Sequence, residues 1–473
     1  MAKNGKNKEQ KGGFWNFIDN IEGDKVVWII VFMLTMISAL AIFSSTSQLT
    51  GDKMSRIDMI KNHSLFILAG YVIIIGLYKI NRIGLFRVVS QFGFMVSLVL
   101  LTLLTFHCDF GFIKAQYINK AWRTLEVFGF QLHVFEVVKV AMVMYLAWAL
   151  HAYKQDQEAI AKRKKSTTLT IANLLAQTKT FSFMSRPFWK RAFYMYIPMA
   201  ITCLMVMKGS NSSGIFIGGI MIATLLIGGI PFKEIGIAIA GAAVILAMAI
   251  GIWHVSDGKV FDRVGTLVNR MTADYSPERL AELEEQGKSR TKEWYEIRDA
   301  IKQPYTAKIA IHEGGLLGKG SGNSTQKYVV THIYSDYMFS FLIEEYGLIG
   351  GILVILLYVS LLARGSMIAR LCSNEYAKIT VGGLSILITG QAFMHMFVNA
   401  GIGPMTGQTL PLISDGSFAF IVFCFAFGVI LSISRMANNR IREEEEAAAP
   451  LYEGERDDIQ ASLDVVEQID MDI

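Results

Sequence analysis

Carboxylates stand at the start of one strongly apolar segment and inside it. Asp336 opens the segment, and Glu344 and Glu345 follow within it. Because a carboxylate is costly in a membrane and usually faces a polar cavity, these positions are candidates for chemistry. Two roles are open to Asp336: a general base that accepts a proton, or a cap whose side-chain oxygens accept backbone N–H groups at a helix start.

A second candidate is the pair Glu136 and Lys139, which lies in another apolar segment. Their spacing of three places both side chains on one face of a helix. Inside a membrane the two charges would offset each other. Such a pair can line a cavity and also hold it together.

A glycine-rich run precedes Asp336. Residues 313–324 read EGGLLGKGSGNS, which ends in Ser324, and Lys319 and Lys327 add positive charge. Glycine lets a backbone bend sharply and approach a ligand, and exposed amides in such a turn can bind an anion. On the glycine pattern alone, a flexible loop without a ligand is the favoured interpretation.

The elements that must position these residues are membrane helices. The chain is 52% hydrophobic and 18% charged, whereas soluble proteins carry about 25% charged residues. A span needs roughly 20 mostly apolar residues. We therefore predict an all-α polytopic membrane protein with about ten transmembrane helices, at 26–47, 64–80, 88–106, 134–153, 192–207, 214–230, 235–254, 337–363, 379–399 and 418–434.

The distribution of charge predicts the orientation. Residues 154–191 contain nine basic and two acidic residues, which is typical of a cytoplasmic loop. We expect a cytoplasmic N-terminal tail at 1–25, a membrane domain at 26–434 and a cytoplasmic, disordered tail at 435–473, in the inner membrane. The long segment 255–335 then lies outside, with a helical stretch at 277–301, and long loops of this kind are often functional.

Several classes of function find no support. The four cysteines show no CxxC spacing, so neither a zinc site nor a disulfide framework is expected. The acidic residues are too few and too dispersed to specify a metal cage. The net charge of +5 names no anionic partner, and we expect no nucleic-acid partner.

Taken in order along the chain, the motifs resemble the SEDS family of shape, elongation, division and sporulation proteins, to which FtsW-like and RodA-like proteins belong. The most specific block reads EGGLLGKGSGNSTQKY and continues to YSDYMFSFLIEEYGLIGG. Other blocks are NKAWR at 119–123, GFQLHVFEVVK at 129–139, GQAFMHMFVN at 390–399 and PMTGQTLPLISDGS at 404–417. The resemblance covers nearly the whole chain.

The resemblance implies a peptidoglycan glycosyltransferase that polymerises lipid II beside a class B penicillin-binding transpeptidase and other membrane proteins of the division machinery. The family's essential Asp corresponds to Asp336, which would act as general base in a reaction that inverts the anomeric carbon. The resemblance also assigns substrate binding to Arg123, Glu136, Lys139, Gln303, Ser324 and Lys327. A divalent cation such as Mg or Mn is a further candidate to compensate the departing pyrophosphate.

Some positions depart from the family pattern. The family's PE-x-HTD motif reads THIYSD at 331–336 here, so His332 is a second candidate proton acceptor. The SYGG motif reads SDGS at 414–417. A lipid II flippase and a non-catalytic division scaffold remain alternatives. The ensemble of blocks favours an FtsW-like division role over RodA-like elongation.

Overall fold

The computed structural model describes residues 22–45, 56–118, 121–164, 168–256, 277–288, 291–329, 333–403, 406–416 and 418–444, and they are mostly helical. The α-helices are α2 (Lys25–Ser45), α3 (Arg56–Tyr78), α4 (Ile83–Thr105), α5 (Val134–Ala161), α6 (Thr170–Leu175), α7 (Pro187–Arg191), α8 (Ile197–Gly209), α9 (Asn211–Ile227), α10 (Phe232–Val255), α12 (Pro277–Glu285), α13 (Lys292–Gly314), α14 (Met338–Leu371) and α15 (Glu375–Asn399). A C-terminal helix, Phe418–Glu444, follows them.

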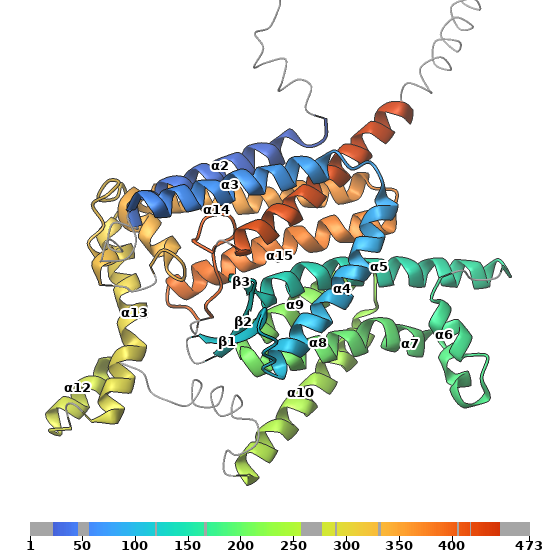
Figure 1. The fold of residues 1–473 in the computed structure, drawn as a ribbon, viewed down its shortest axis with the longest axis horizontal. Coiled ribbons are helices and arrows are strands. Elements are labelled where there is room, and N and C mark those ends of the chain that lie inside the picture. The colour runs from blue at the N-terminus through green and yellow to red at the C-terminus, as the bar shows by residue number, and fades with distance from the viewer. Residues whose placement is uncertain are drawn as a thin grey trace, which may run out of the picture.

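The helices confirm a polytopic membrane protein. Among the described residues, eight helices are long and apolar enough to cross a membrane, one of them formed by α7, a π-helical turn and α8 together. Each of the ten expected segments overlaps a helix. The two expected segments that are not among these eight helices overlap α9 and α10. Helices α2, α3, α14 and α15 run side by side (Figure 1). The count of ten spans stays a prediction.

Helix α5 lies at the centre of the fold. In its most apolar window 83% of the residues are buried, against 17% for α3. Helices α4, α9 and α15 pack around it. A lipid-facing helix such as α3 can be apolar all round, whereas a central helix can carry polar groups that partners on other helices satisfy. The candidate pair Glu136 and Lys139 lies in the first turns of α5.

A small antiparallel sheet precedes α5, and the all-α prediction did not include it. It consists of β1 (Ile113–Ile118), β2 (Ala121–Val127) and β3 (Phe130–His133), in that spatial order. The β2–β3 turn places Phe128 and Gly129 at positive φ, as a tight hairpin requires. Polar and apolar residues alternate only in the second half of β2, from Thr124 to Val127.

The long segment before Asp336 is more divided than predicted. The expected helical stretch 277–301 forms two helices, α12 and α13, which are separated near Gly287 at positive φ, and α13 continues to Gly314. Residues 257–276 lie outside the described part.

The C-terminal helix continues to Glu444, beyond the expected tail boundary at 435, while residues 1–21 and 445–473 lie outside the described part. Helices α13 and α6 lie at opposite ends of the helix bundle (Figure 1).

Candidate active site

Lys139 is the centre of a buried polar cluster. Its side chain is 2% exposed, and its Nζ donates to Glu136 Oε1 at 2.7 Å, to Gln391 Oε1 at 2.5 Å and to Gln408 Oε1 at 2.9 Å. The three acceptors use the three protons of the ammonium group. The predicted pairing of Glu136 with Lys139 is therefore confirmed, and two glutamine side chains that the sequence did not single out complete it.

In the part of the chain that the structure describes, only one of the two carboxylate oxygens of Glu136 is hydrogen-bonded. Its Oε1 accepts from Lys139, while its buried Oε2 has no hydrogen-bond partner among the described residues. A buried acceptor without a donor is costly, so such atoms often mark a place where a ligand or water binds. Glu136 lies in the first turn of α5, where the helix dipole favours its negative charge.

Arg123 and His133 belong to the small sheet, on β2 and β3, next to the helix that carries this pair. Thr124 on β2 pairs with His133 on β3, and His133 is the N-cap residue of α5. Arg123, the residue before Thr124, therefore lies near the N-terminal end of α5. His133 keeps an exposed surface at the end of β3, and the pKa of its imidazole is lowered first by the partial loss of water around the ring. The charges of Lys139 and Arg123 lower it further, against the opposing effect of Glu136. All four side chains therefore lie in one electrostatic neighbourhood.

One segment connects this cluster to the region of Asp336. In the described residues 406–416, Gly407 lies against the Arg123 guanidinium, since a Cβ added there would be 3.3 Å from Nη1. Gln408 contacts Lys139 and also donates through Nε2 to Ser213 Oγ at 2.9 Å. Farther along, Ser414 Oγ donates to the Ser335 carbonyl at 2.9 Å. We call residues 406–416 the connecting segment.

The connecting segment brings a second carboxylate to the neighbourhood of Asp336. The backbone N–H of Asp415 donates to the Tyr334 carbonyl at 2.9 Å. Burial raises the pKa of Asp415. The pKa of Tyr334 is raised by burial first, and then by the charges of Asp415 and Asp336. Sequence reasoning noted Asp415 only as a departure from the SYGG motif and missed its position beside the candidate base.

Asp336 is half-buried and lies outside the cap position of α14. The N-cap residue is Tyr337. Helix α15 instead caps α14: the Ser340 N–H donates to Asn399 Oδ1 at 2.9 Å, and the Phe339 N–H contacts His395 Nε2 at 3.4 Å. These are the amides that an N-cap side chain normally satisfies. The capping interpretation of Asp336 therefore loses its main support.

Asn399 also holds the backbone of Asp336. Its Nδ2 donates to the Asp336 carbonyl at 3.1 Å and to the His395 carbonyl at 2.8 Å. His395 in turn contacts the Gln408 carbonyl through Nδ1 at 2.8 Å. A chain of hydrogen bonds and backbone thus joins Lys139 to Asp336.

The glycine-rich run has a different role from the one its pattern suggests. The backbone N–H of Gly322 in the run donates to Glu345 at 3.0 Å, and that of Thr325, directly after the run, donates to Glu344 at 2.8 Å. The anion held by this loop is therefore the chain's own pair of carboxylates. Glu344 and Glu345, expected to face a polar cavity, face this loop.

Ser324 and Lys327 belong to the same arrangement. Ser324 Oγ donates to Glu344 Oε2 at 2.5 Å. Lys327 is 1% exposed, and its Nζ donates to the Gly322 carbonyl at 2.7 Å. Both side chains have internal partners here, and their contact with substrate stays a prediction. Gln303 lies half-buried on α13 and forms no hydrogen bond or ion pair with another described residue.

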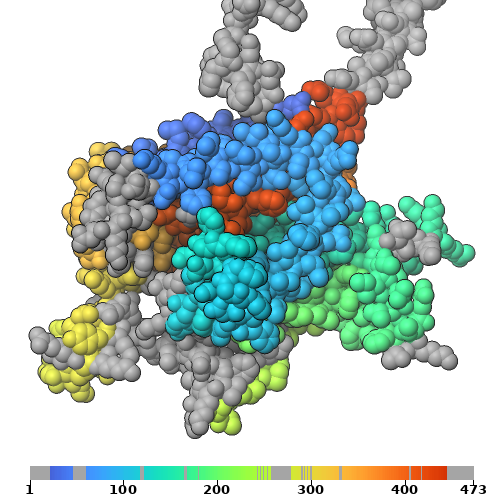
Figure 2. All heavy atoms as spheres, in the orientation of Figure 1, coloured from blue at the N-terminus to red at the C-terminus, as the bar shows by residue number. Residues whose placement is uncertain are grey.

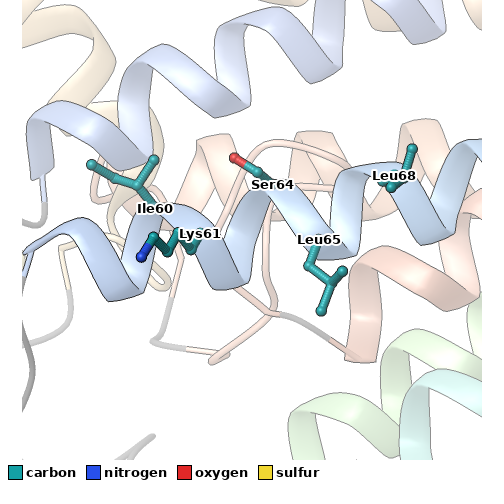
Figure 3. A pocket seen from close by; sticks show the side chains of 5 residues that line it. All are labelled: Ile60, Lys61, Ser64, Leu65 and Leu68. Atoms are coloured by element: carbon teal, nitrogen blue, oxygen red, sulfur yellow. The ribbon is translucent and has the colours of Figure 1, made fainter.

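The described residues do not assemble a metal site from their own side chains. No group of three or more His, Cys, Asp or Glu side chains in this part of the chain is arranged to hold a metal ion. A hollow of about 380 Å³ in this part of the chain is an open apolar surface on α3. It is lined by Ile60, Lys61, Ser64, Leu65 and Leu68 (Figure 3), and none of the candidate site residues lines it.

Fold and site together define a multi-pass membrane protein with a buried polar cluster tied to a half-buried aspartate. The chain belongs to the FtsW/RodA/SpoVE family, described as "Cell cycle protein", whose family model matches residues 24–439. The motif resemblance is thereby confirmed.

Named relatives agree with this membership. The chain is 27% identical over 361 residues to a probable peptidoglycan glycosyltransferase FtsW of Coxiella burnetii, covering 76% of this chain and 81% of that protein. It is 24% identical to the protein of the same name in Geobacter metallireducens, covering 87% and 94%. The peptidoglycan glycosyltransferase MrdB of Escherichia coli K12 matches at 36% over 129 residues, 27% of this chain and 35% of that protein.

Solved structures share the fold. A chain of a peptidoglycan synthase complex, described for its coordination of polymerization and crosslinking, aligns with a TM-score of 0.57 at 17% identity, covering 87% of this chain and 98% of that one. A mutant of the rod shape determining protein RodA of Thermus thermophilus aligns with a TM-score of 0.52 at 17% identity, covering 87% and 97%.

Proposed function

We propose that this protein is a peptidoglycan glycosyltransferase that polymerises lipid II at the outer face of the cytoplasmic membrane. The observation that carries the proposal is the release of Asp336 from helix capping: Asn399 and His395 satisfy the first amides of α14. A half-buried carboxylate that does not cap its own helix can serve as a proton acceptor, and Asp336 Oδ1 accepts a hydrogen bond from Ser335 Oγ at 3.2 Å. The names of the relatives support the same activity.

In the proposed reaction, the 4-hydroxyl of the acceptor sugar attacks the anomeric carbon of the donor, and the lipid pyrophosphate departs. Asp336 removes the hydroxyl proton as the new bond forms. Direct displacement inverts the anomeric carbon, so no covalent enzyme intermediate is required.

The departing pyrophosphate needs positive charge. Arg123 is the best-placed candidate, because it lies on β2 with its guanidinium against Gly407 of the connecting segment. Lys139 and Lys327 each donate to internal acceptors, so their contribution would be to shape the site. No three His, Cys, Asp or Glu side chains of the described part are grouped to hold a metal ion, and we derive no step through Mg or Mn.

Purified protein supplied with labelled lipid II tests the activity. Formation of glycan strands supports the polymerase. Transfer of lipid II between leaflets without strand formation would support the flippase alternative. The absence of both strand formation and transfer would support a non-catalytic scaffold.

We further propose a division role of the FtsW type, with a class B penicillin-binding transpeptidase and other division proteins as partners. FtsW is the name carried by the relatives with broad coverage, and a structural neighbour comes from a complex that couples polymerization to crosslinking. Depletion of the protein should give filamentous cells, whereas round cells would support a RodA-like role in elongation.

Both termini are proposed to be cytoplasmic, with the α12–α13 region outside. The basic loop that contains α6 lies at the opposite end of the bundle from α13 (Figure 1). In intact spheroplasts of a strain in which Cys108 is serine, a membrane-impermeant thiol reagent should label Gln286→Cys and spare Thr178→Cys. The reverse pattern would contradict this orientation.

A further inference from the structure

The segment between α5 and α8 exposes aromatic rings outside the packed core. Phe181, Phe183, Phe188 and Trp189 are 36–42% exposed. Their rings contact one another, with centroids 5.0 Å apart for Phe183 and Trp189 and 5.7 Å for Phe188 and Trp189. Four adjoining rings at a surface form an apolar patch that needs a partner or a membrane. We call these four residues the aromatic patch.

All the charged residues of the same segment are basic. Residues 159–191 contain eight Lys or Arg residues and no Asp or Glu. Two of these charges are used internally: Lys190 pairs with Asp156 at 2.6 Å, and Arg191 pairs with Glu234 at 2.5 Å. By contrast, Lys162, Arg163, Lys164 and Arg186 are exposed and form no ion pair with another described residue.

The internal pairs fix the segment in place. Asp156 is fully buried at the end of α5, and it accepts from Lys190 Nζ and from Asn173 Nδ2, at 2.6 and 2.9 Å. Lys190 lies on α7 and Asn173 on α6, so one carboxylate anchors both short helices. The aromatic patch is thus presented by an ordered element.

The placement of this element matches a membrane surface. Helix α6 and the 3₁₀ helix that follows it, Lys179–Ser185, extend sideways from the end of the bundle instead of continuing the axis of α5 (Figure 1). The space-filling view shows this region standing out beside the bundle (Figure 2). Trp and aromatic rings concentrate at the membrane–water interface, and clusters of Lys and Arg next to a span bind anionic lipid headgroups.

We propose that residues 162–164 and 168–189 form a binding surface for anionic phospholipid, in which the aromatic patch enters the interfacial layer while Lys162, Arg163, Lys164 and Arg186 contact lipid phosphates. The need for charge in a cytoplasmic loop explains the basic residues, but it does not explain four exposed rings on an anchored element. An anionic lipid surface is the partner that uses both features. This inference does not depend on the proposed enzymatic activity.

Binding of fluorescent phosphatidylglycerol to the purified full-length protein in neutral detergent tests the charges, with fluorescent phosphatidylcholine as the reference lipid. A variant with Lys162, Arg163, Lys164 and Arg186 replaced by Gln should bind phosphatidylglycerol roughly tenfold or more weakly, because each basic residue contributes separately. Its binding of phosphatidylcholine should not change. The matched control replaces Lys3, Lys6, Lys8 and Lys11 by Gln, which removes the same charge elsewhere, and it should keep the preference.

Hydrogen exchange in nanodiscs tests the aromatic patch. Amides at 170–189 should exchange more slowly in nanodiscs with phosphatidylglycerol than in nanodiscs of phosphatidylcholine alone, and the double variant Phe183→Ser, Trp189→Ser should lose that difference while the exchange of α5 stays unchanged. A preference for phosphatidylglycerol that survives in the four-Gln variant, or an equal loss in the control, overturns the proposal. Protection that appears only on addition of an acidic protein also overturns it and assigns the patch to a protein partner.

Discussion

Asn399 and Asp336 are joined by a hydrogen bond from the buried Asn399 amide to the Asp336 carbonyl, at 3.1 Å. The same amide side chain accepts from the backbone N–H and the hydroxyl of Ser340, at 2.9 and 2.8 Å. One side chain of α15 therefore caps α14 and fixes the backbone of the residue proposed as general base. The position of Asp336 depends on α15 as much as on its own segment.

Replacing Asn399 should impair polymerisation more than it impairs folding. In Asn399→Ala, the backbone N–H of Ser340 and the carbonyl of Asp336 lose their Asn399 partner, which costs about 1–3 kcal/mol for each group left unsatisfied. The matched control is Ser340→Ala, which removes one hydrogen bond to the same Asn without touching Asp336. Both variants should lower the unfolding temperature, but only Asn399→Ala should strongly lower strand formation well below that temperature. Equal activity in the two variants would show that Asn399 has no positioning role.

Replacing Lys139 should destabilise the central cluster. Lys139→Ala leaves Glu136 as a buried carboxylate without a counter-charge, and breaking a buried pair in this way costs on the order of 3–5 kcal/mol. We expect a lower unfolding temperature, a lower protein level and loss of strand formation. The double variant with Glu136→Gln should recover part of the stability, since it removes the uncompensated charge. Full stability and activity of Lys139→Ala would mean that the pair is peripheral.

Two glycines of the loop around Glu344 and Glu345 allow a matched comparison. Gly318 and Gly322 both have positive φ, but a Cβ at Gly318 would collide with the backbone of Glu345 and Gly347, whereas a Cβ at Gly322 would meet open space. Gly322→Ala should therefore cost only the strain of a left-handed residue, roughly 1–2 kcal/mol. Gly318→Ala should lower the unfolding temperature clearly more. Equal unfolding temperatures would contradict the packing of this loop on α14.

The sequence predicted the helices and the pair Glu136–Lys139 because each depends on local pattern: apolar length for a span, and a spacing of three for a shared helix face. The partners of Lys139 could not be predicted in this way. Gln391 and Gln408 lie more than 250 positions away along the chain, and nothing in their local sequence marks them as partners.

For the glycine-rich run, the local sequence described the turn but not the group that it binds. Its composition allowed an anion-binding turn but favoured a flexible loop without a ligand, whereas the turn binds carboxylates, those of Glu344 and Glu345 of the same chain. Local composition predicts what a turn can bind, while the tertiary fold decides which group reaches it. Local pattern made Asp336 one candidate among several carboxylates, and the motif resemblance supplied the reason to propose it as the general base.

The most direct test of the account is the strand-forming rate of Asp336→Asn on labelled lipid II, compared with wild type at equal amounts of folded protein. Asn keeps the size of Asp and its ability to accept hydrogen bonds but cannot act as the base. Since general-base assistance typically contributes about 10²–10⁴-fold, we predict a loss of about that size with an unchanged unfolding temperature. A rate near that of wild type would contradict the assignment of Asp336 as the base.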